Sequence, residues 1–222
     1  MQKFDTPAPI TAVLDIPAGR IRFVATDGTD TTVEILPADP AKSRDTKAAE
    51  DTTVQYADGV LRIEAAPATS RILGRSGSVE VTVRLPAGSH LDAKAAAAEL
   101  RGVGRLGDIT VDAAQGTVEL DETTSAHLTL LAGDITVGRL TGPARISTQK
   151  GDIRITEAVH GEADLSTLAG DITVDAAPGT SATLDAGTTR GRIHNTFRNT
   201  GTTPALTVHA TTALGDITAR SL

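Results

Sequence analysis

A five-residue motif, Gly-Asp-Ile-Thr-Val, recurs through the second half of the chain and limits the folds available to it. It stands intact at 107–111, 133–137 and 170–174, and variants begin at 116, 151, 191 and 215. The glycines at 116, 133, 151, 170, 191 and 215 are spaced 17, 18, 19, 21 and 24 residues apart, with a second short strand in each interval. The copy at 107 precedes Gly116 by half a period, so we expect it on the opposite side of a coil.

A period of this length with two short strands is that of one rung of a β-solenoid. A rung cannot bury its apolar face alone, so rungs stack about 4.8 Å apart and share one core. Alternation directs the following side chains inward: Ile109, Val111, Ile135, Val137, Ile153, Ile155, Ile172, Val174, Ile193 and Ile217. It directs these outward: Thr110, Thr136, Arg154, Thr173, His194 and Thr218. The sequence predicts an all-β fold, a β-solenoid or β-helix with two short strands per rung of 17–24 residues.

The first ninety residues show alternating apolar and polar positions between turn signals, which is typical of hairpins. We expect antiparallel strands over 1–90 that cap or extend into a solenoid formed by 91–222, the two making one continuous unit. A loop within this region carries Arg71, Ile72, Leu73 and Arg75. Either it docks a partner protein, or its two apolar residues fold back over the end of the solenoid.

Composition excludes several classes of protein. The chain has 222 residues, a formal net charge of −7, no cysteine and 2% aromatic residues. The lack of cysteine excludes disulfide frameworks, thiolate metal sites and cysteine nucleophiles. An acidic chain with few aromatic residues offers neither the basic stripe nor the stacking platform of a nucleic-acid binder. No signal-peptide pattern or membrane-spanning apolar run is visible, so we expect a cytoplasmic protein that would reach the surface only by non-classical export.

Several short motifs occur in a particular order along nearly the whole chain. They are Phe4-Asp-Thr-Pro7, Gly77-Ser-Val-Glu-Val-Thr-Val83, Leu85-Pro-Ala-Gly-Ser89, the recurring Gly-Asp-Ile-Thr-Val and the closing Gly215-Asp-Ile-Thr218. In this order they resemble the putative adhesin family of bacterial β-strand-repeat proteins, a domain of unknown function, in its actinobacterial form. The resemblance implies a β-solenoid-like fold, no known catalytic residues and no established activity.

The Gly-Asp corners are the first candidate site. They are Gly133, Asp134, Gly151, Asp152, Gly170, Asp171, Gly215 and Asp216. Stacking in chain order places Arg192 between Asp171 and Asp216. Carboxylates about 5 Å apart repel, so either a cation such as Ca²⁺ binds them, or each accepts backbone N–H groups at its own corner. The turn interpretation is favoured because one carboxylate per rung supplies few ligands, and we expect neither a metal site nor a cofactor.

The remaining polar residues predict neither a metal site nor a catalytic site. The histidines at 90, 127, 160, 194 and 209 lack metal-binding spacing and are expected on exposed strands and turns. The outward threonines are interpreted as ordinary residues of exposed strands. Outward acidic pairs such as Asp164 and Asp185 would suit a polysaccharide-cleaving β-helix, but only Phe197 offers an aromatic platform in the repeats. No catalytic residue is therefore assigned.

The C-terminus ends at Arg220-Ser-Leu222 without a following element that would cover it. An unprotected strand edge invites pairing, so we expect a homo-oligomer formed through the solenoid edge. The leading function is a non-enzymatic β-solenoid scaffold or protein-interaction module with an unidentified protein partner. The alternatives are an adhesin-like surface binding protein and a carbohydrate-active β-helix enzyme.

Overall fold

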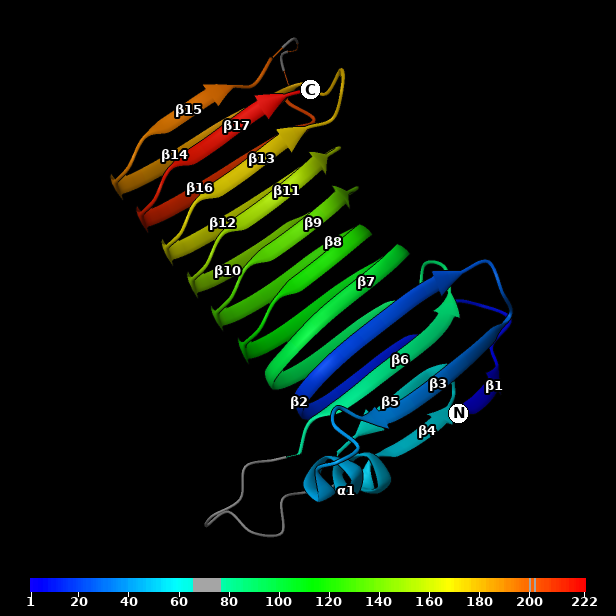
Figure 1. Ribbon diagram of the computed structural model, residues 1–222. Coiled ribbons are helices and arrows are strands. Elements are labelled where there is room, and N and C mark those ends of the chain that lie inside the picture. Colours follow the sequence, from blue (N-terminus) through cyan, green and yellow to red (C-terminus); the bar gives the residue numbers. More distant parts are fainter. Residues whose placement is uncertain (66–76, 200, 202) are drawn as a thin grey trace.

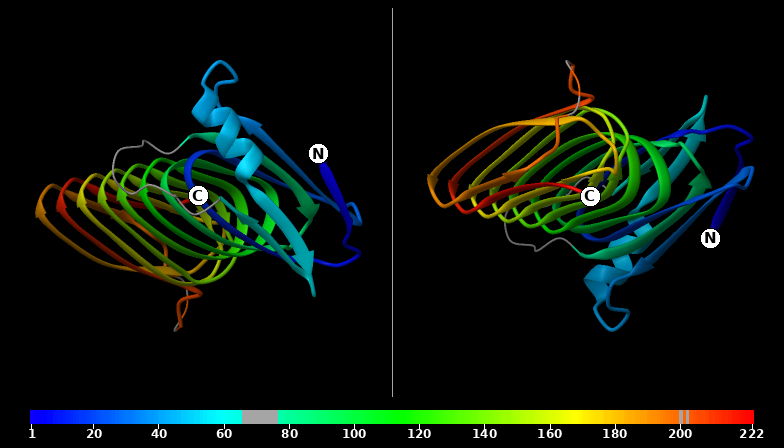
Figure 2. Two further views of the ribbon diagram at one scale, coloured as in Figure 1. Left: turned by 90° about the horizontal axis from the view of Figure 1, so that it is seen from below. Right: turned by 90° about the horizontal axis from the view of Figure 1, so that it is seen from above.

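The strands form one continuous sheet that winds into a stack of flattened rungs (Figures 1 and 2). The computed structural model describes residues 1–65, 77–199, 201 and 203–222. The elements before the main stack are β1 (Gln2–Asp5), β2 (Thr11–Thr26), β3 (Asp30–Pro37), α1 (Ser43–Asp51), β4 (Thr53–Ala57), β5 (Val60–Glu64) and β6 (Val79–Pro86). Those that follow are β7 (His90–Gln115), β8 (Val118–Ala132), β9 (Ile135–Leu140), β10 (Ala144–Lys150), β11 (Ile153–Ala158), β12 (Gly161–Ala169), β13 (Ile172–Ala176), β14 (Ala182–Arg190), β15 (Ile193–Thr196), β16 (Leu206–Leu214) and β17 (Ile217–Ser221).

Each rung contributes one strand to each of two facing sheets. The β12 face contains β5, β10, β12, β14 and β16, and the β13 face contains β6, β9, β11, β13, β15 and β17. The longer strands β2, β7 and β8 run from one face to the other. Pairing between rungs is parallel and in register, so that Ile135, Ile153 and Ile172 are direct neighbours. The predicted β-solenoid is therefore confirmed.

The space between the two faces is filled by small and branched apolar side chains. Every residue predicted to point inward is buried except Ile193, which is 46% exposed. Its strand, β15, belongs to the last rung of the stack, where no further rung of described residues covers the inward side chain. Three of the four aromatic residues lie in the N-terminal part, where Phe23 is fully buried and the rings of Phe4 and Tyr56 are 5.5 Å apart.

The N-terminal region differs from the expected set of antiparallel strands. β2 runs parallel to β7 over both faces, with Thr11 opposite His90 and Val24 opposite Val103. On its other side, β2 pairs in parallel with β5 and β6. Part of the first ninety residues thus stacks as solenoid rungs, because an alternating apolar pattern suits a parallel neighbour as well as a hairpin partner.

Antiparallel strands and the helix cover the outer side of the rung formed by β5 and β6. β4 pairs with β5, β3 with β6, and β1 with β3. The helix α1 packs against β3 and β6, and its buried Asp45 accepts a 3.0 Å hydrogen bond from the backbone N–H of Ser78. No helix in the described part of the chain has the length and apolar character needed to cross a membrane.

The C-terminal rung lies one place inside the end of the stack (Figure 1). β16 pairs with β12 on one side and β14 on the other, and β17 pairs likewise with β13 and β15. The chain thus skips a place after β13, forms the outermost rung with β14 and β15, and returns to fill the gap. The expectation that the last residues of the chain form the open edge is wrong, because β14 and β15 form it.

An ion pair between a buried aspartate and a half-exposed arginine holds the inserted rung. The Asp175 side chain, at the end of β13, is 4% exposed. Its two carboxylate oxygens each accept a 2.8 Å hydrogen bond from the guanidinium of Arg220 on β17. A bidentate pair of this kind fixes both groups and therefore fixes β17 against β13.

Candidate functional site

The predicted Gly-Asp corners form one edge of the stack. Their glycines adopt positive φ, for example 141° at Gly133 and 155° at Gly170. A Cβ added to Gly133 would lie 1.5 Å from the carbonyl oxygen of Gly116, and one added to Gly170 would lie 1.9 Å from that of Gly151. Only glycine fits these corners, because each backbone turn lies directly against the one before it.

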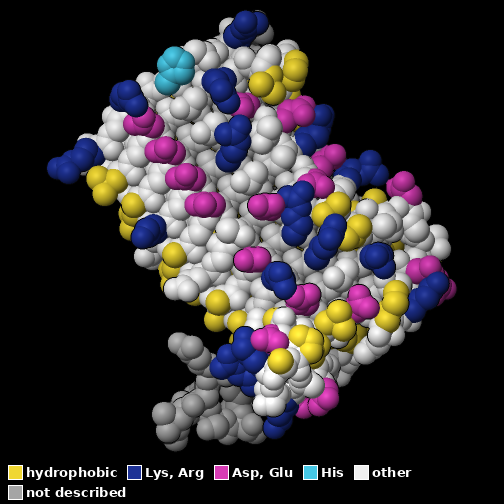
Figure 3. Space-filling model, in the orientation of Figure 1, with side chains coloured by type: hydrophobic (Ala, Val, Ile, Leu, Met, Phe, Trp, Pro, Cys, Tyr) yellow, Lys and Arg dark blue, Asp and Glu magenta, His cyan; other side chains and the backbone are white. Residues whose placement is uncertain are grey.

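The corner aspartates form a ladder of hydrogen bonds along this edge, where Figure 3 shows acidic side chains in a row. Oδ1 of Asp134 accepts the N–H of Asp152, Oδ1 of Asp152 accepts the N–H of Asp171, and Oδ1 of Asp171 accepts the N–H of Asp216, at 2.7–2.9 Å. The acceptor at each corner thus serves the next rung and not its own corner, unlike the expected Asx turn. One oxygen of each of these carboxylates is used in binding the backbone.

Arg192 ends the ladder instead of interrupting it. Its backbone N–H donates to Oδ1 of Asp216 at 2.8 Å, and its guanidinium donates to Oδ2 at 2.9 Å. These contacts, the backbone hydrogen bond first, hold the pKa of Asp216 below its ordinary value. The expected position of Arg192 between Asp171 and Asp216 is wrong, because the C-terminal rung lies between β13 and β15.

Threonine side chains that are buried or half-buried support the same edge and were not singled out from the sequence. The side chain of Thr167 donates a 3.1 Å hydrogen bond to the carbonyl of Gly151, and that of Thr212 donates one of the same length to Gly170. Thr188 does the same to Gly215. The spacing Thr-x-x-Gly, which recurs before Gly151, Gly170, Gly191 and Gly215, is the signal that would have predicted them.

A groove of about 810 Å³ lies between α1 and the β12 face. Its lining includes Lys47 and Asp51 of α1 and Lys94 of β7, and it borders residues 65 and 77. The predicted docking loop of Arg71, Ile72, Leu73 and Arg75 belongs to the intervening segment, which lies outside the described residues. We therefore assign no ligand to this groove.

A row of polar side chains crosses the β12 face in register. It runs from His127 on β8 through Arg145 on β10 and Asp164 on β12 to His209 on β16 and Asp185 on β14. Arg145 donates to Asp164 at 3.3 Å. The two acids that sequence analysis compared with a catalytic pair, Asp164 and Asp185, are separated by His209 and do not face one another across a groove.

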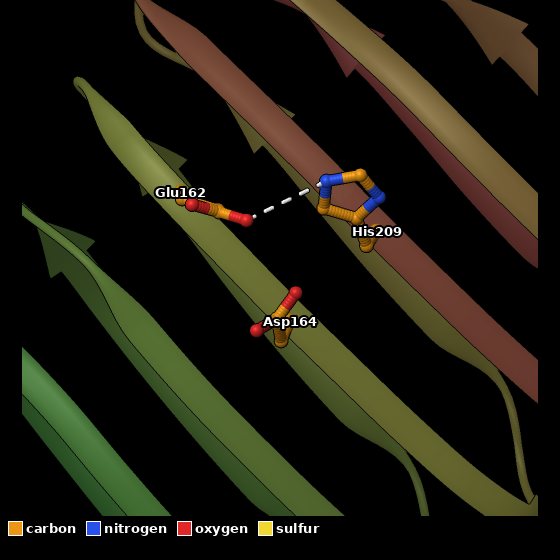
Figure 4. A group of neighbouring side chains, drawn as sticks. All are labelled: Glu162, Asp164 and His209. Carbon is orange, nitrogen blue, oxygen red and sulfur yellow. Dashed lines mark ion pairs between the residues drawn. The ribbon is translucent and has the colours of Figure 1, made fainter.

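Glu162, Asp164 and His209 lie together on this face (Figure 4). One ligand atom from each residue lies within 4.8 Å of the others, and this is the one group of its kind in the described part of the chain. Nε2 of His209 is 3.7 Å from Oε1 of Glu162, and Nδ1 is 3.6 Å from Oδ2 of Asp185. Sequence analysis did not bring these residues together, because they come from strands about forty residues apart.

The outward residues of the β13 face show no comparable grouping. Arg154 lies between Thr136 and Thr173 on the neighbouring strands, and His194 lies beside Thr218. Arg154 and His194 are exposed. This arrangement agrees with the interpretation of the threonines as ordinary residues of an exposed strand.

Solved structures with a similar architecture are named putative adhesins. One from Bacteroides fragilis matches with a TM-score of 0.50 and 13% identity, over 98% of this chain and 95% of that chain. One from Parabacteroides distasonis matches with a TM-score of 0.44 and 16% identity, over 100% and 95%. A putative cell adhesion protein from Clostridium sporogenes gives 0.41 and 11%, over 100% and 98%. The first of these likenesses shows a shared fold.

The family is shown by the sequence itself. No curated protein matches the chain. The family model described as Toastrack DUF4097 matches residues 12–221, which include every rung of the stack and all of the Gly-Asp corners. The chain therefore belongs to the Toastrack DUF4097 family, whose fold is a β-solenoid.

Proposed function

We propose that this protein is a non-enzymatic interaction module that pairs with a second copy of itself through its open end, the outer edges of β14 and β15. The observation that carries the proposal is the one-sided pairing of these two strands. Among the described residues, β14 pairs with β16 alone and β15 with β17 alone. Unpaired strand edges are templates for pairing with another chain.

The direction of the free backbone groups on β14 follows from its hydrogen bonds. The N–H of Leu206 donates to the carbonyl of Ser181. The odd-numbered residues of β14 therefore direct their N–H and C=O groups toward β16. The even-numbered residues turn the other way, as the hydrogen bond from the N–H of Ala182 to Arg198 illustrates. Ala186 and Thr188 therefore direct their N–H and C=O groups toward the free side of the rung.

The other end of the molecule provides a precedent for closing such a rung. There, antiparallel strands lie on both faces, β4 on β5 and β3 on β6. A second copy turned by 180° about an axis perpendicular to the sheets would supply antiparallel strands in the same way, its β14 on β14 and its β15 on β15. Such a two-fold contact is closed and self-complementary. It would also cover Ile193, which is 46% exposed.

The polar face supports a role without catalysis. Glycoside hydrolysis by two carboxylates needs both groups to flank one bond across a cleft. Here the candidate acids Asp164 and Asp185 are side by side with His209 between them, and Asp164 is paired with Arg145. Binding through strand edges makes no demand on these residues.

The proposal is tested by light scattering after size-exclusion chromatography, from nanomolar to high micromolar concentration. We expect the wild-type chain to shift from monomer to dimer. Ala186→Pro removes one outward N–H without touching the ladder to β16, and it should abolish the shift. Ala186→Ser keeps the N–H and is the matched control, which should dimerise normally. A wild-type chain that stays monomeric throughout, or an Ala186→Pro variant that dimerises like Ala186→Ser, would overturn the proposal.

A further inference from the structure

We propose that Glu162, Asp164 and His209 form a binding site for a divalent transition-metal ion such as Zn²⁺ on the β12 face. The proposal goes beyond the pairing of two copies, because none of the three residues belongs to the end rung. It rests on the placement of three ligand side chains by two rigid strands, the orientation of the imidazole and the chemistry of the donor atoms.

The backbone places the three ligands without a loop. Glu162 and Asp164 are two residues apart on β12, so they point to the same side of the sheet. His209 is the direct neighbour of Asp164 on β16. Ligand atoms at about 2.0–2.1 Å from a tetrahedral Zn²⁺ are separated by about 3.3 Å. The 3.7 Å between Nε2 of His209 and Oε1 of Glu162 needs only a small side-chain rotation to reach this separation.

Asp185 acts as a positioning residue for His209. Its Oδ2 lies 3.6 Å from Nδ1, on the side of the ring away from Glu162. Histidines that bind metals commonly donate their other N–H to a carboxylate, which fixes the tautomer and the orientation of the ring. The 3.6 Å contact is slightly longer than a hydrogen bond, and a small rotation would direct Nδ1–H to Asp185. The lone pair of Nε2 would then be directed toward Glu162.

The donor set selects the class of ion. One imidazole nitrogen and two carboxylate oxygens suit Zn²⁺ and similar first-row ions, with water completing the shell. Ca²⁺ takes six to eight oxygen ligands and binds imidazole poorly, so three ligands including a histidine disfavour it. The site spans β12 and the inserted β16, so the ion would fasten the C-terminal rung to the rung before it.

Arg145 competes with the ion for Asp164. Its Nη2 lies 3.3 Å from Oδ2 of Asp164, and its positive charge opposes the approach of a cation. The side chain of Arg145 is 70% exposed, so it is free to move into solvent when the ion binds. Replacement of Arg145 by an uncharged residue should therefore strengthen metal binding, which a merely structural ion pair would not predict.

The test is isothermal titration calorimetry of the full, untagged chain with Zn²⁺. We expect one ion per chain in the wild type and at least a tenfold weaker affinity in His209→Gln. Glu162→Gln changes an exposed side chain and should also weaken binding about tenfold, so the result does not depend on how His209→Gln folds. Asp185→Asn should weaken binding severalfold, and Arg145→Gln should strengthen it.

His127→Gln is the matched control, because His127 lies on the same face and in the same row but beside Arg145 instead of an acid. It should bind Zn²⁺ like the wild type. Three results would each overturn the proposal: no binding by the wild-type chain, binding that His209→Gln and Glu162→Gln leave unchanged, or equal weakening by His127→Gln. Failure of the metal proposal would leave the proposed pairing of two copies through β14 and β15 untouched, because the light-scattering test of that pairing uses no added metal.

Discussion

The two ends of the stack share one topology and differ in how they finish. At each end, the rung nearest the chain terminus lies one place inside the end of the stack. The rung of β2 lies between β5–β6 and β7, and the rung of β16–β17 lies between β12–β13 and β14–β15. At the N-terminal end, antiparallel strands and α1 cover the outer rung. At the C-terminal end, no described strand pairs with the outer edge of β14 or β15. Insertion between two rungs gives the rung nearest each chain terminus a neighbour on both sides. Among the described residues, the covering strands and α1 at the N-terminal end leave only the rung at the C-terminal end of the stack with open strand edges.

The largest expected effect is a difference in stability between truncation at the C-terminus and truncation at the N-terminus. Removal of residues 206–222 takes away the parallel partner of four strands, so we expect loss of the cooperative unfolding transition in the C-terminal rungs. Removal of residues 1–5 takes away β1, which pairs with β3 alone, and should lower Tm by only a few degrees. Thermal unfolding followed by circular dichroism compares the two variants. Similar losses from both would contradict the account.

The corner glycines sharpen the contrast between inner and outer rungs. An added Cβ at Gly170 or Gly191 would lie 1.9 Å from a carbonyl oxygen of the neighbouring corner. Gly170→Ala should cost about 3 kcal/mol or more, because rungs on both sides prevent relief of the clash. Gly191→Ala should cost about 1–2 kcal/mol, because the outer rung is able to shift outward.

Gly179→Ala is the control for the backbone term alone, since φ is +79° there and no atom lies within 4 Å of the added Cβ. Urea unfolding measures all three variants. Equal costs for Gly170→Ala and Gly191→Ala would mean that the outer rung is as tightly held as the inner ones.

Each end also contains one buried aspartate, and the two should respond differently. Arg220→Met leaves Asp175 buried without its counter-ion and should lower Tm by several degrees, because an unpaired buried charge is strongly unfavourable. The double variant Asp175→Asn/Arg220→Met should recover part of the loss. Asp45→Ala leaves the N–H of Ser78 without its acceptor and removes a longer, 3.6 Å contact with the half-exposed Arg44, but it leaves no buried charge, so it should have the smaller effect. Calorimetry measures the loss of Tm in each variant. A larger loss in Asp45→Ala than in Arg220→Met would contradict this prediction.

The smallest expected effect concerns titration at the end of the aspartate ladder. Arg192 holds the pKa of Asp216 below its ordinary value, so the stabilisation from this contact is complete above the pKa of the unfolded chain and is lost as pH falls through the lowered pKa. Arg192→Ala should raise the pKa of Asp216 part of the way back, since the backbone hydrogen bond remains. Carboxyl NMR titration measures the shift.

Asp39 near α1 is the control at the other end of the stack. Its pKa is lowered by a hydrogen bond from the side chain of Lys42 and another from the N–H of Ala41. Arg192→Ala should leave it unchanged. A pKa of Asp216 that does not move in Arg192→Ala would contradict the role of Arg192 as the end of the ladder.

The rungs and their corners were predictable because the signals are local. Alternation of apolar residues sets the inward columns, and glycine marks each position of positive φ. The order of the rungs was not predictable in the same way, because nearly identical motifs allow any rung to stack on any other. The one signal was the wider spacing of 21 and 24 residues before Gly191 and Gly215, which leaves chain for the crossing connections.

The grouping of Glu162, Asp164 and His209 on the β12 face could not be predicted for the same reason. Glu162 and Asp164 share a face by simple alternation, which the sequence makes visible. Their contact with His209 depends on the insertion of β16 beside β12. Stacking in chain order would place Asp185 beside Asp164 instead. A candidate site that depends on rung order therefore needs the structure.

Cross-linking tests the insertion of the C-terminal rung most directly, because the chain contains no native cysteine. Ser166 on β12 pairs with Thr211 on β16, and Gly187 on β14 pairs with Thr211 from the other side. Adjacent strands are about 4.8 Å apart and alternate ones about 9.6 Å, whereas a disulfide needs Cα atoms within about 7 Å. The account predicts a disulfide in Ser166→Cys/Thr211→Cys after mild oxidation and none in Ser166→Cys/Gly187→Cys. Stacking in chain order would give the opposite result, and mass spectrometry of the oxidised monomers distinguishes the two.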